Sequence, residues 1–475
     1  MREEENNLRR LVGSSLSPLF WALLLLLYGN TFAQEERVNT RGMGMARTSV
    51  VASRSLDAVG INPANLGYEE GKTVTIGFLP AFGVHLGSNF LDYDLYTSYF
   101  TGIDSDSGRV GKYLTPQDKQ KILDAFPAGV GSVFTNVDLR LFGLAIEVPQ
   151  IGTFAFTVTE HVNGLVRLPR DYADFLFNGN PPGTTRDFGE SDVKAAWTRD
   201  YALSYGMSLP RLTFTRTLEA GISLKLIHGY GYAGLERFNG RLTTASNGVL
   251  TGTVAYAAKS AGVDFIAEEN SGEYSPFPTP AGVGFAVDLG AAATVKDFLS
   301  VGISLTDVGS MTWSGNASEV SVDTTLVVDD PLATSQNDAI DQSLRGKKKD
   351  IDEFYSTLPT QLRIGVALQI DKLPGNEGFP GSLLVELDYN QGFQEVPGST
   401  TSPRFSLGVE YLPLDWLPIR SGISVGGTDR FNAAFGFGLK FGGFVFDLAT
   451  ENVNWIVAPG SFSYASIGMG MKIRF

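Results

Sequence analysis

Hydrophobic and polar residues alternate along most of the chain, from about residue 72 to the end. In residues 361–370, for example, Leu362, Ile364, Val366, Leu368 and Ile370 alternate with Gln361, Arg363, Gly365, Ala367 and Gln369. The same alternation occurs at 154–158, 201–209, 283–289, 299–305, 383–390 and 404–411. Successive side chains of a strand point to opposite faces, so a period of two predicts strands with one apolar and one polar or small face.

Turn sequences separate the alternating stretches. Examples are Phe441-Gly442-Gly443-Phe444 and Pro149-Gln150-Ile151-Gly152. Glycine and proline between apolar runs are typical of connections between strands. The spacing predicts an all-β protein of roughly 14 strands.

The composition of the polar face and the last strand decide between a soluble sandwich and a membrane barrel. The face opposite the apolar one is mostly Gly, Ala and Ser, where a soluble sandwich carries many Lys, Glu and Thr. The final stretch alternates Met471, Ile473 and Phe475 with Lys472 and Arg474, and Phe475 is the last residue. Such a terminal strand resembles the assembly signal of bacterial outer-membrane barrels. We therefore expect a transmembrane antiparallel β-barrel, in which closure leaves no unpaired strand edge in lipid.

The N-terminus has the features of a secretory signal. Basic residues Arg9 and Arg10 precede an apolar run at 19–27 and the small-x-small sequence Thr31-Phe32-Ala33. The run is too short to span a bilayer, so we expect residues 1–33 to be cleaved. After Ala33 there is no stretch of 18 apolar residues. The expected location is the outer membrane of a diderm bacterium, reached with the help of the barrel-assembly machinery.

Composition excludes several kinds of chemistry. The chain has no cysteine, so disulfides, thiolate metal sites and cysteine nucleophiles are absent. The formal net charge of −14 opposes nucleic-acid binding, which needs a positive surface. Glycine is unusually abundant, with 55 in 475 residues.

Three stretches depart from the alternation. Residues 92–99 and 116–126 are expected to form short helices in one extracellular insertion, the second with Thr115 as N-cap and Pro116 at its first position. The long polar stretch 321–358 is expected to include a helix over 337–355. Long loops of such barrels lie outside the cell, so these stretches form either solvated loops or a surface for a protein partner.

Residues 34–71 precede the first predicted strand and contain a family motif. They include Arg41-Gly42-Met43-Gly44-Met45-Ala46-Arg47 and then Asn62-Pro63-Ala64-Asn65-Leu66. This region resembles the start of the long-chain fatty-acid transporter superfamily, which also includes shuttle proteins of a secretion system. The whole chain is similar, more closely, to an uncharacterised outer-membrane barrel family. Here Asn65 stands where the transporters usually have Gly, so no fatty-acid contact residue is carried over.

The resemblance implies that residues 34–71 fold into the barrel lumen as a hatch, with residues 72–475 as the barrel. Asn62 can cap a short helical turn with Pro63 at its first position, followed by Ala64, and Gly42 and Gly44 allow tight bends. Arg37, Arg41, Arg47 and Arg54 lie in this segment. The polar strand faces offer Glu386, Asp388, Glu410 and Asp288 as partners, and Arg363 and Arg404 as further lumen residues. Opposite charges in a partly dry lumen would hold the segment in place.

Catalytic motifs occur only by coincidence. Gly422-Ile423-Ser424-Val425-Gly426 fits the nucleophile-elbow pattern, but Ser424 lies within an alternating stretch and not in a strand-to-helix turn. His85, His161 and His228 are far apart, and Asp104 to Gly108 lacks the later carboxylates of a calcium loop. We expect no enzyme activity, metal or cofactor. Two functions remain: a channel for hydrophobic or amphipathic small molecules, or a surface scaffold that binds a secretion or surface protein. An outer-membrane hydrolase, supported only by Ser424, is a weaker third.

Overall fold

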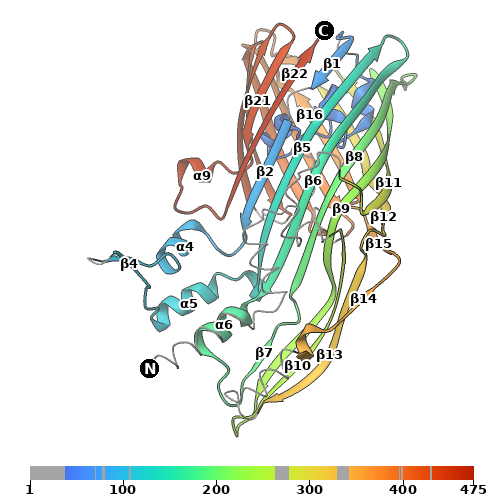
Figure 1. Cartoon of the computed structure of the whole chain (residues 1–475). Coiled ribbons are helices and arrows are strands. Elements are labelled where there is room, and N and C mark those ends of the chain that lie inside the picture. The colour runs from blue at the N-terminus through green and yellow to red at the C-terminus, as the bar shows by residue number, and fades with distance from the viewer. Residues whose placement is uncertain are drawn as a thin grey trace.

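A computed structural model describes residues 38–69, 71–77, 81–105, 108–262, 278–328, 342–394, 396, 400–427 and 431–475. The predicted export signal and Arg37 lie outside the described residues. The fold is a closed antiparallel barrel of 14 strand positions (Figure 1). Two positions are each formed by two consecutive strands, β1 with β2 and β15 with β16. The prediction of an all-β barrel of roughly 14 strands is confirmed.

The barrel strands follow one another around the ring in chain order. They are β1 (Val74–Gly77) with β2 (Ala81–Ser88), β5 (Val130–Val148), β6 (Gly152–Pro169), β8 (Asp192–Ser208), β9 (Thr217–Thr244), β11 (Gly282–Lys296), β12 (Leu299–Trp313), β15 (Phe354–Thr357) with β16 (Gln361–Gln369), β17 (Ser382–Gly392), β18 (Arg404–Leu414), β19 (Leu417–Gly426), β20 (Phe431–Phe441), β21 (Phe444–Thr450) and β22 (Tyr464–Arg474). The last strand, β22, pairs with β1 and β2, which closes the ring.

The two faces of the wall differ as the alternation predicts. Apolar side chains such as Phe285 (68% exposed) and Leu387 (53% exposed) point outward. Their neighbours Asp288 and Asp388 are fully buried on the inner side. The apolar exterior is suited to contact with lipid. The strands also meet the length requirement, since a tilted strand of 9 to 11 residues crosses a bilayer.

The two ends of the barrel are different. At the short-turn end, tight connections such as Gly442-Gly443 join the strands, and the C-terminus lies here (Figure 1). The long-loop end carries α4 (Tyr93–Tyr99), α5 (Pro116–Asp124), α6 (Arg170–Asn178) and α9 (Asn454–Val457), with η3 (Pro127–Gly129) and the small hairpin of β3 (Ile103–Ser105) and β4 (Gly108–Val110). Helices α4 and α5 confirm two predictions, and Thr115 caps α5 through a bond from Asp118 N at 3.2 Å. None of the helices in the described ranges is long and apolar enough to cross a membrane.

Strand β9 continues past the long-loop end of the barrel. Its outer part pairs with β7 (Thr185–Asp187) and with β10 (Leu250–Ala261). Strand β10 pairs with β13 (Ser318–Val328), and β13 pairs with β14 (Lys347–Asp350), so a small sheet projects from the barrel (Figure 1). Residues 337–341 of the predicted helix over 337–355 lie outside the described residues, and the prediction is wrong from residue 347 onward, because β14 and β15 form there. Pairing with β13 and β12 satisfies the backbone of these strands and overrides local helix preference.

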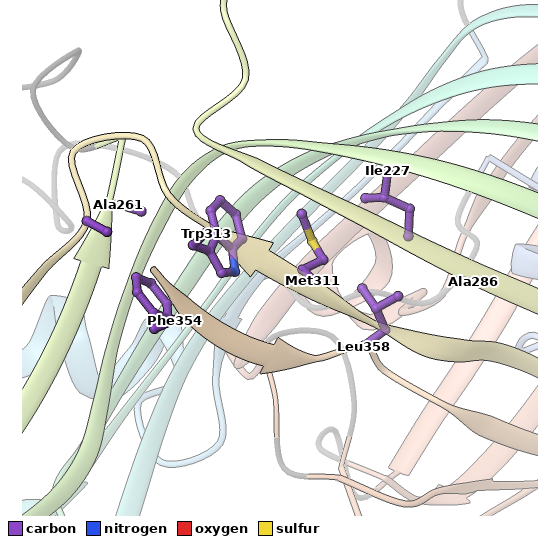
Figure 2. Packing of buried hydrophobic residues seen from close by; sticks show 8 residues of the cluster. Ile227, Ala261, Ala286, Met311, Trp313, Phe354 and Leu358 are labelled. Atoms are coloured by element: carbon purple, nitrogen blue, oxygen red, sulfur yellow. The ribbon is translucent and has the colours of Figure 1, made fainter. Parts of the chain in front are cut away.

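An apolar cluster packs on the inner side of the wall toward the long-loop end. Trp313 and Phe354 lie on paired strands with their rings stacked at 6.4 Å, and Met311 and Leu358 lie beside them (Figure 2). The cluster consists of Ile227, Ala261, Ala286, Met311, Trp313, Ala317, Phe354 and Leu358. It gives this part of the inner wall an apolar surface.

Candidate functional site

Residues 38–69, called here the N-terminal segment, lie inside the barrel toward the short-turn end (Figure 1). The segment contains α3 (Thr40–Met43), η1 (Ser55–Ala58) and η2 (Pro63–Gly67). Most of its residues are buried, and it contacts inward-facing residues of strands on all sides of the ring. The segment therefore fills the cross-section of the barrel at this level.

Asparagine side chains shape the segment locally. Asn39 caps α3 by accepting from Gly42 N at 3.0 Å, and Asn62 caps η2 by accepting from Ala64 N at 3.2 Å, with Pro63 at the first position. The Asn62 amide also donates to Val50 O at 3.1 Å, as does the Asn65 amide at 2.9 Å. These bonds satisfy buried backbone groups that have no strand partner.

Two carboxylates on β17 hold the middle of the segment. Asp388 Oδ2 accepts from the amides of Ser49 (2.7 Å) and Val50 (3.0 Å). Glu386 Oε1 accepts from the amides of Val51 (2.6 Å) and Ala52 (3.3 Å). Four consecutive backbone N–H groups thus point at two side chains that lie on the same inner face of one strand. These four bonds make the clamp a main attachment of the segment.

Ion pairs attach the segment to a second region of the wall. Arg41 binds Glu410 through two nitrogens, at 2.9 and 2.6 Å. Glu410 also accepts from Arg420 at 2.6 Å, and Arg420 in turn bonds Asp447 at 2.6 Å. Arg47 forms a bidentate ion pair with Glu451, the residue that follows β21. Each of these buried charges has an opposite partner, which offsets the cost of removing it from water.

Further wall residues bond the rest of the segment. Arg363 donates to Gly60 O at 2.8 Å, Arg140 donates to Leu56 O at 3.0 Å, and Ser304 donates to Ile61 O at 2.6 Å. Arg404 and Arg363 both line a small cavity next to Arg47. Arg54 stays within the segment, where it donates to Val51 O at 2.6 Å and stacks 4.0 Å above the Tyr68 ring.

Charge pairing determines the protonation of two groups in the segment. Burial alone lowers the pKa of a guanidinium and raises the pKa of a carboxyl. Attraction to Glu410 outweighs burial at Arg41 and raises its pKa above the ordinary value. Asp57 accepts a hydrogen bond from Lys472. Burial alone would raise the pKa of Asp57, but the attraction to Lys472 outweighs burial and lowers it. Both groups are therefore charged at neutral pH.

Glycines on the inner face of the wall make room for the segment. A Cβ at Gly408 would lie 2.8 Å from Met45 Cβ, and one at Gly206 would lie 2.6 Å from Leu66 Cβ. Gly44 of the segment faces Gly436, with a Cβ-to-Cα distance of 3.1 Å. Other glycines in equivalent contact with the segment are Gly143, Gly221, Gly290, Gly302, Gly365, Gly422, Gly468 and Gly470. This set, called here the glycine ring, accounts for part of the glycine excess.

The glycine ring yields a matched pair of variants on one strand. On β9, a Cβ at Gly221 would overlap the main chain of Pro63, whereas a Cβ at Gly231 has open space. Overpacking costs about 1–3 kcal/mol, so Gly221→Val is expected to displace the segment and to accelerate tryptic cleavage at Arg41, Arg47 and Arg54 by about tenfold or more. Gly231→Val is expected to leave cleavage unchanged. Equal cleavage of both variants would contradict tight seating of the segment.

Beyond the segment, toward the long-loop end, the inner wall carries buried polar groups. Lys225 lies between Asp307 (2.6 Å) and Asp288 (3.0 Å), and His161 lies 2.8 Å from Asp138. Near this end, a separate cavity of about 360 Å³ is lined by Trp197, Tyr230, Pro278 and Pro280, and Trp197 and Tyr230 lie with Glu160 and Arg199 on the outer face of the wall. Inside the wall, the apolar cluster gives the long-loop half of the lumen a surface suited to apolar solutes.

The remaining predicted residues lie away from this site. Ser424 is an inward residue of β19 that accepts from the Asn432 amide at 3.0 Å, and it has no histidine partner there. At the C-terminus, Phe475 N donates to Val74 O at 2.8 Å, and its exposed ring follows Met471 and Ile473 on the closing strand.

Sequence reasoning did not find several partners that the structure brings together. Glu451, Arg420, Arg140 and Lys472 contact the segment or its partners, and none was proposed from the sequence. Asp288, proposed as a partner for an arginine, pairs with Lys225 instead. One signal was available in the sequence: glycine recurs at alternate, inward-facing positions of the strands. Glycine at such a position leaves space inside the wall, which indicates that another segment of the chain approaches closely there.

The closed ring, the apolar exterior and the filled lumen define the class as a membrane-spanning β-barrel with an internal N-terminal segment. The chain belongs to DUF5723, a family of unknown function whose model matches residues 63–451. The prediction of an uncharacterised barrel family is therefore confirmed. A search of curated proteins found no match.

Similar solved structures include three bacterial proteins. The Ralstonia pickettii toluene transporter TbuX has 13% sequence identity and a TM-score of 0.44, with 91% of this chain and 97% of that chain covered. The Pseudomonas putida toluene transporter TodX has 11% identity and a TM-score of 0.43, with 94% and 99% covered. A Pseudomonas aeruginosa FadL homologue has 13% identity and a TM-score of 0.42, with 94% and 99% covered.

Proposed function

We propose that this protein is an outer-membrane channel for hydrophobic or amphipathic small molecules, and that residues 34–71 act as its hatch. The observation that carries the proposal is the position of the N-terminal segment, which fills the lumen and is attached to the wall by hydrogen bonds and ion pairs in addition to a small apolar cluster around Leu56 and Leu66. The clamp of Glu386 and Asp388 and the pairs of Arg41 and Arg47 are bonds that water can replace. A segment held this way can be displaced without unfolding the barrel.

The two halves of the lumen have complementary roles in this proposal. A solute enters at the long-loop end, where Met311, Trp313 and Phe354 offer apolar surface. It then meets the segment, where Asn62, Pro63 and Ala64 form the turn η2 against β8, β9 and β11. Displacement of the segment opens the way to the short-turn end, which faces the periplasm because long loops of such barrels lie outside the cell.

Native mass spectrometry tests the proposal on protein extracted gently from its own outer membrane. We expect a lipid-like small molecule in stoichiometric amount, and we expect it to be lost when residues 34–70 are deleted. A stoichiometric second protein with an empty lumen would contradict the channel and support the scaffold described next.

A surface scaffold is the second candidate, and the exposed apolar residues of the long-loop end favour it. Tyr113 is 86% exposed, and Leu176, on helix α6 beside β7 of the projecting sheet, is 79% exposed. Replacing residues 329–345 with a short Gly-Ser linker keeps β13 and β14. If a secretion or surface partner binds this end, the replacement is expected to abolish its co-purification while the barrel still assembles. Unchanged co-purification would count against this stretch.

We further propose that Phe475, with Ile473 and Met471, acts as the signal for the barrel-assembly machinery. Deleting Phe475 removes the bond of its amide to Val74 O and an exposed aromatic side chain from the strand that closes the ring. Most of the chain is then expected to stay unassembled, as measured by the folded band on unheated gels. Val457→Ser, at an exposed residue of the α9 loop, serves as the control and should assemble normally. Normal assembly without Phe475 would contradict this role.

A further inference from the structure

A cavity of about 420 Å³ lies between the N-terminal segment and the wall at the short-turn end. The segment contributes Arg41, Arg54 and Tyr68, and the wall contributes residues next to the tight turns, including Phe298 and Lys372. We call this the basic cavity. It is separate from the apolar surfaces of the long-loop half.

The described residues that line the basic cavity carry more positive than negative charge. Seven are basic and four are acidic. The four acidic residues are already engaged by cations: Glu410 by Arg41 and Arg420, Asp447 by Arg420, Asp57 by Lys472, and Asp297 by Arg216. This excess is a local reversal of sign in a chain whose formal net charge is −14.

Two lysines contribute to this positive excess. Lys440, the penultimate residue of strand β20, is partly buried at the cavity wall, and Lys372 is exposed in η4 (Ile370–Lys372) at the cavity rim. Within the described part of the chain, neither lysine forms a salt bridge. A cation at the wall of a partly enclosed cavity attracts anions more strongly than one on an open surface, because less water screens it.

We propose that the basic cavity binds a small anion, namely a carboxylate or phosphate group, free or as the head of an amphiphile. Leu384 and Val445 line the same cavity and offer a short apolar surface beside the charges. Binding at this site does not depend on the proposed transport function, since the cavity is formed with the segment in its seated position. If transport also holds, an anionic solute would be retained here as it leaves the lumen.

Isothermal titration of the detergent-solubilised full-length barrel tests the site. The probes are octanoate, inorganic phosphate and octyltrimethylammonium, which pairs the same alkyl chain with the opposite charge. Octanoate is expected to bind and octyltrimethylammonium is not. Lys372→Gln and Lys440→Gln are each expected to weaken octanoate binding by about fivefold. Lys347→Gln and Lys348→Gln, two exposed lysines of β14 at the other end of the barrel, should have no effect.

The outcomes separate the sources of the anion. Binding of octanoate alone supports an amphiphile head, and binding of inorganic phosphate as well supports a general small-anion site. Equal binding of octanoate and octyltrimethylammonium would overturn the proposal, as would an equal effect of the β14 variants. Lys372 lies in an exposed turn, so its variant tests the site even if Lys440→Gln assembles poorly. Absence of octanoate binding to the wild-type barrel, together with normal solute uptake, would refute the site and not the channel.

Discussion

Deleting residues 34–70 is expected to convert a closed barrel into a conducting one. The segment fills the lumen at one level, and the glycine ring around it has no side chains that could take its place. After deletion, Glu386, Asp388, Glu410 and Glu451 lose their segment partners. Unpaired buried carboxylates are strongly disfavoured, so water enters and hydrates them. An open aqueous path follows from both effects.

Single-channel recording in planar bilayers measures this change. Wild-type barrels are expected to show little or no current, and the deletion variant is expected to show steady, salt-dependent conductance. Deletion of residues 102–111, which include the exposed strands β3 and β4 of the long-loop insertion, serves as the control and should leave the current unchanged. The folded band on unheated gels establishes that each variant assembles. An assembled deletion variant that stays closed would refute the hatch.

A disulfide between residues 40 and 470 is expected to lock the channel. A Cβ at Gly470 would lie 3.6 Å from Thr40 Cβ, within the range that disulfides span. The chain has no cysteine, so Thr40→Cys with Gly470→Cys introduces the only thiols. The bond would join α3 of the segment to β22 of the wall. If solutes pass only when the segment is displaced, uptake by the oxidised double variant falls close to background and recovers on reduction.

The strength of the seating explains why this lock should have a large effect. Four amide bonds to Glu386 and Asp388 and the ion pairs of Arg41 and Arg47 must all be exchanged for water when the segment moves, and each charge-assisted bond of the two arginines contributes about 1.5–3 kcal/mol. The displaced state is therefore a minor population that a solute must favour by differential binding. A covalent bond removes that state altogether.

The single variants Thr40→Cys and Gly470→Cys are the controls for the lock. Each keeps the barrel and introduces a thiol without a partner, so uptake by each should not respond to oxidant. Equal uptake by the oxidised and reduced forms of the double variant, with the disulfide shown by mass spectrometry, would contradict gating by displacement of α3.

The alternating pattern by itself determined the wall of this protein. Period-two alternation placed Ile364 outside and Arg363 inside without knowledge of any neighbour, because side-chain direction in a strand is a local property. Local chemistry was also sufficient for α5, where Thr115 and Pro116 start a helix, and for η2, where Asn62 and Pro63 do so. Each of these features depends on residues within a few positions of one another.

Only the tertiary structure decided which groups meet inside the wall. Asp388 meets the amide of Ser49 across 339 positions of sequence, and Arg47 meets Glu451 across 404. Such pairs depend on the number of strands, on their register and on how the ring closes, which no local pattern encodes. The same holds for residues 347–350, which form a strand because β13 offers them a pairing edge. The sequence by itself determined which strand faces are polar. Closure of the barrel determined which polar groups meet in the lumen, because contacts between residues so far apart in sequence depend on the geometry of the whole ring.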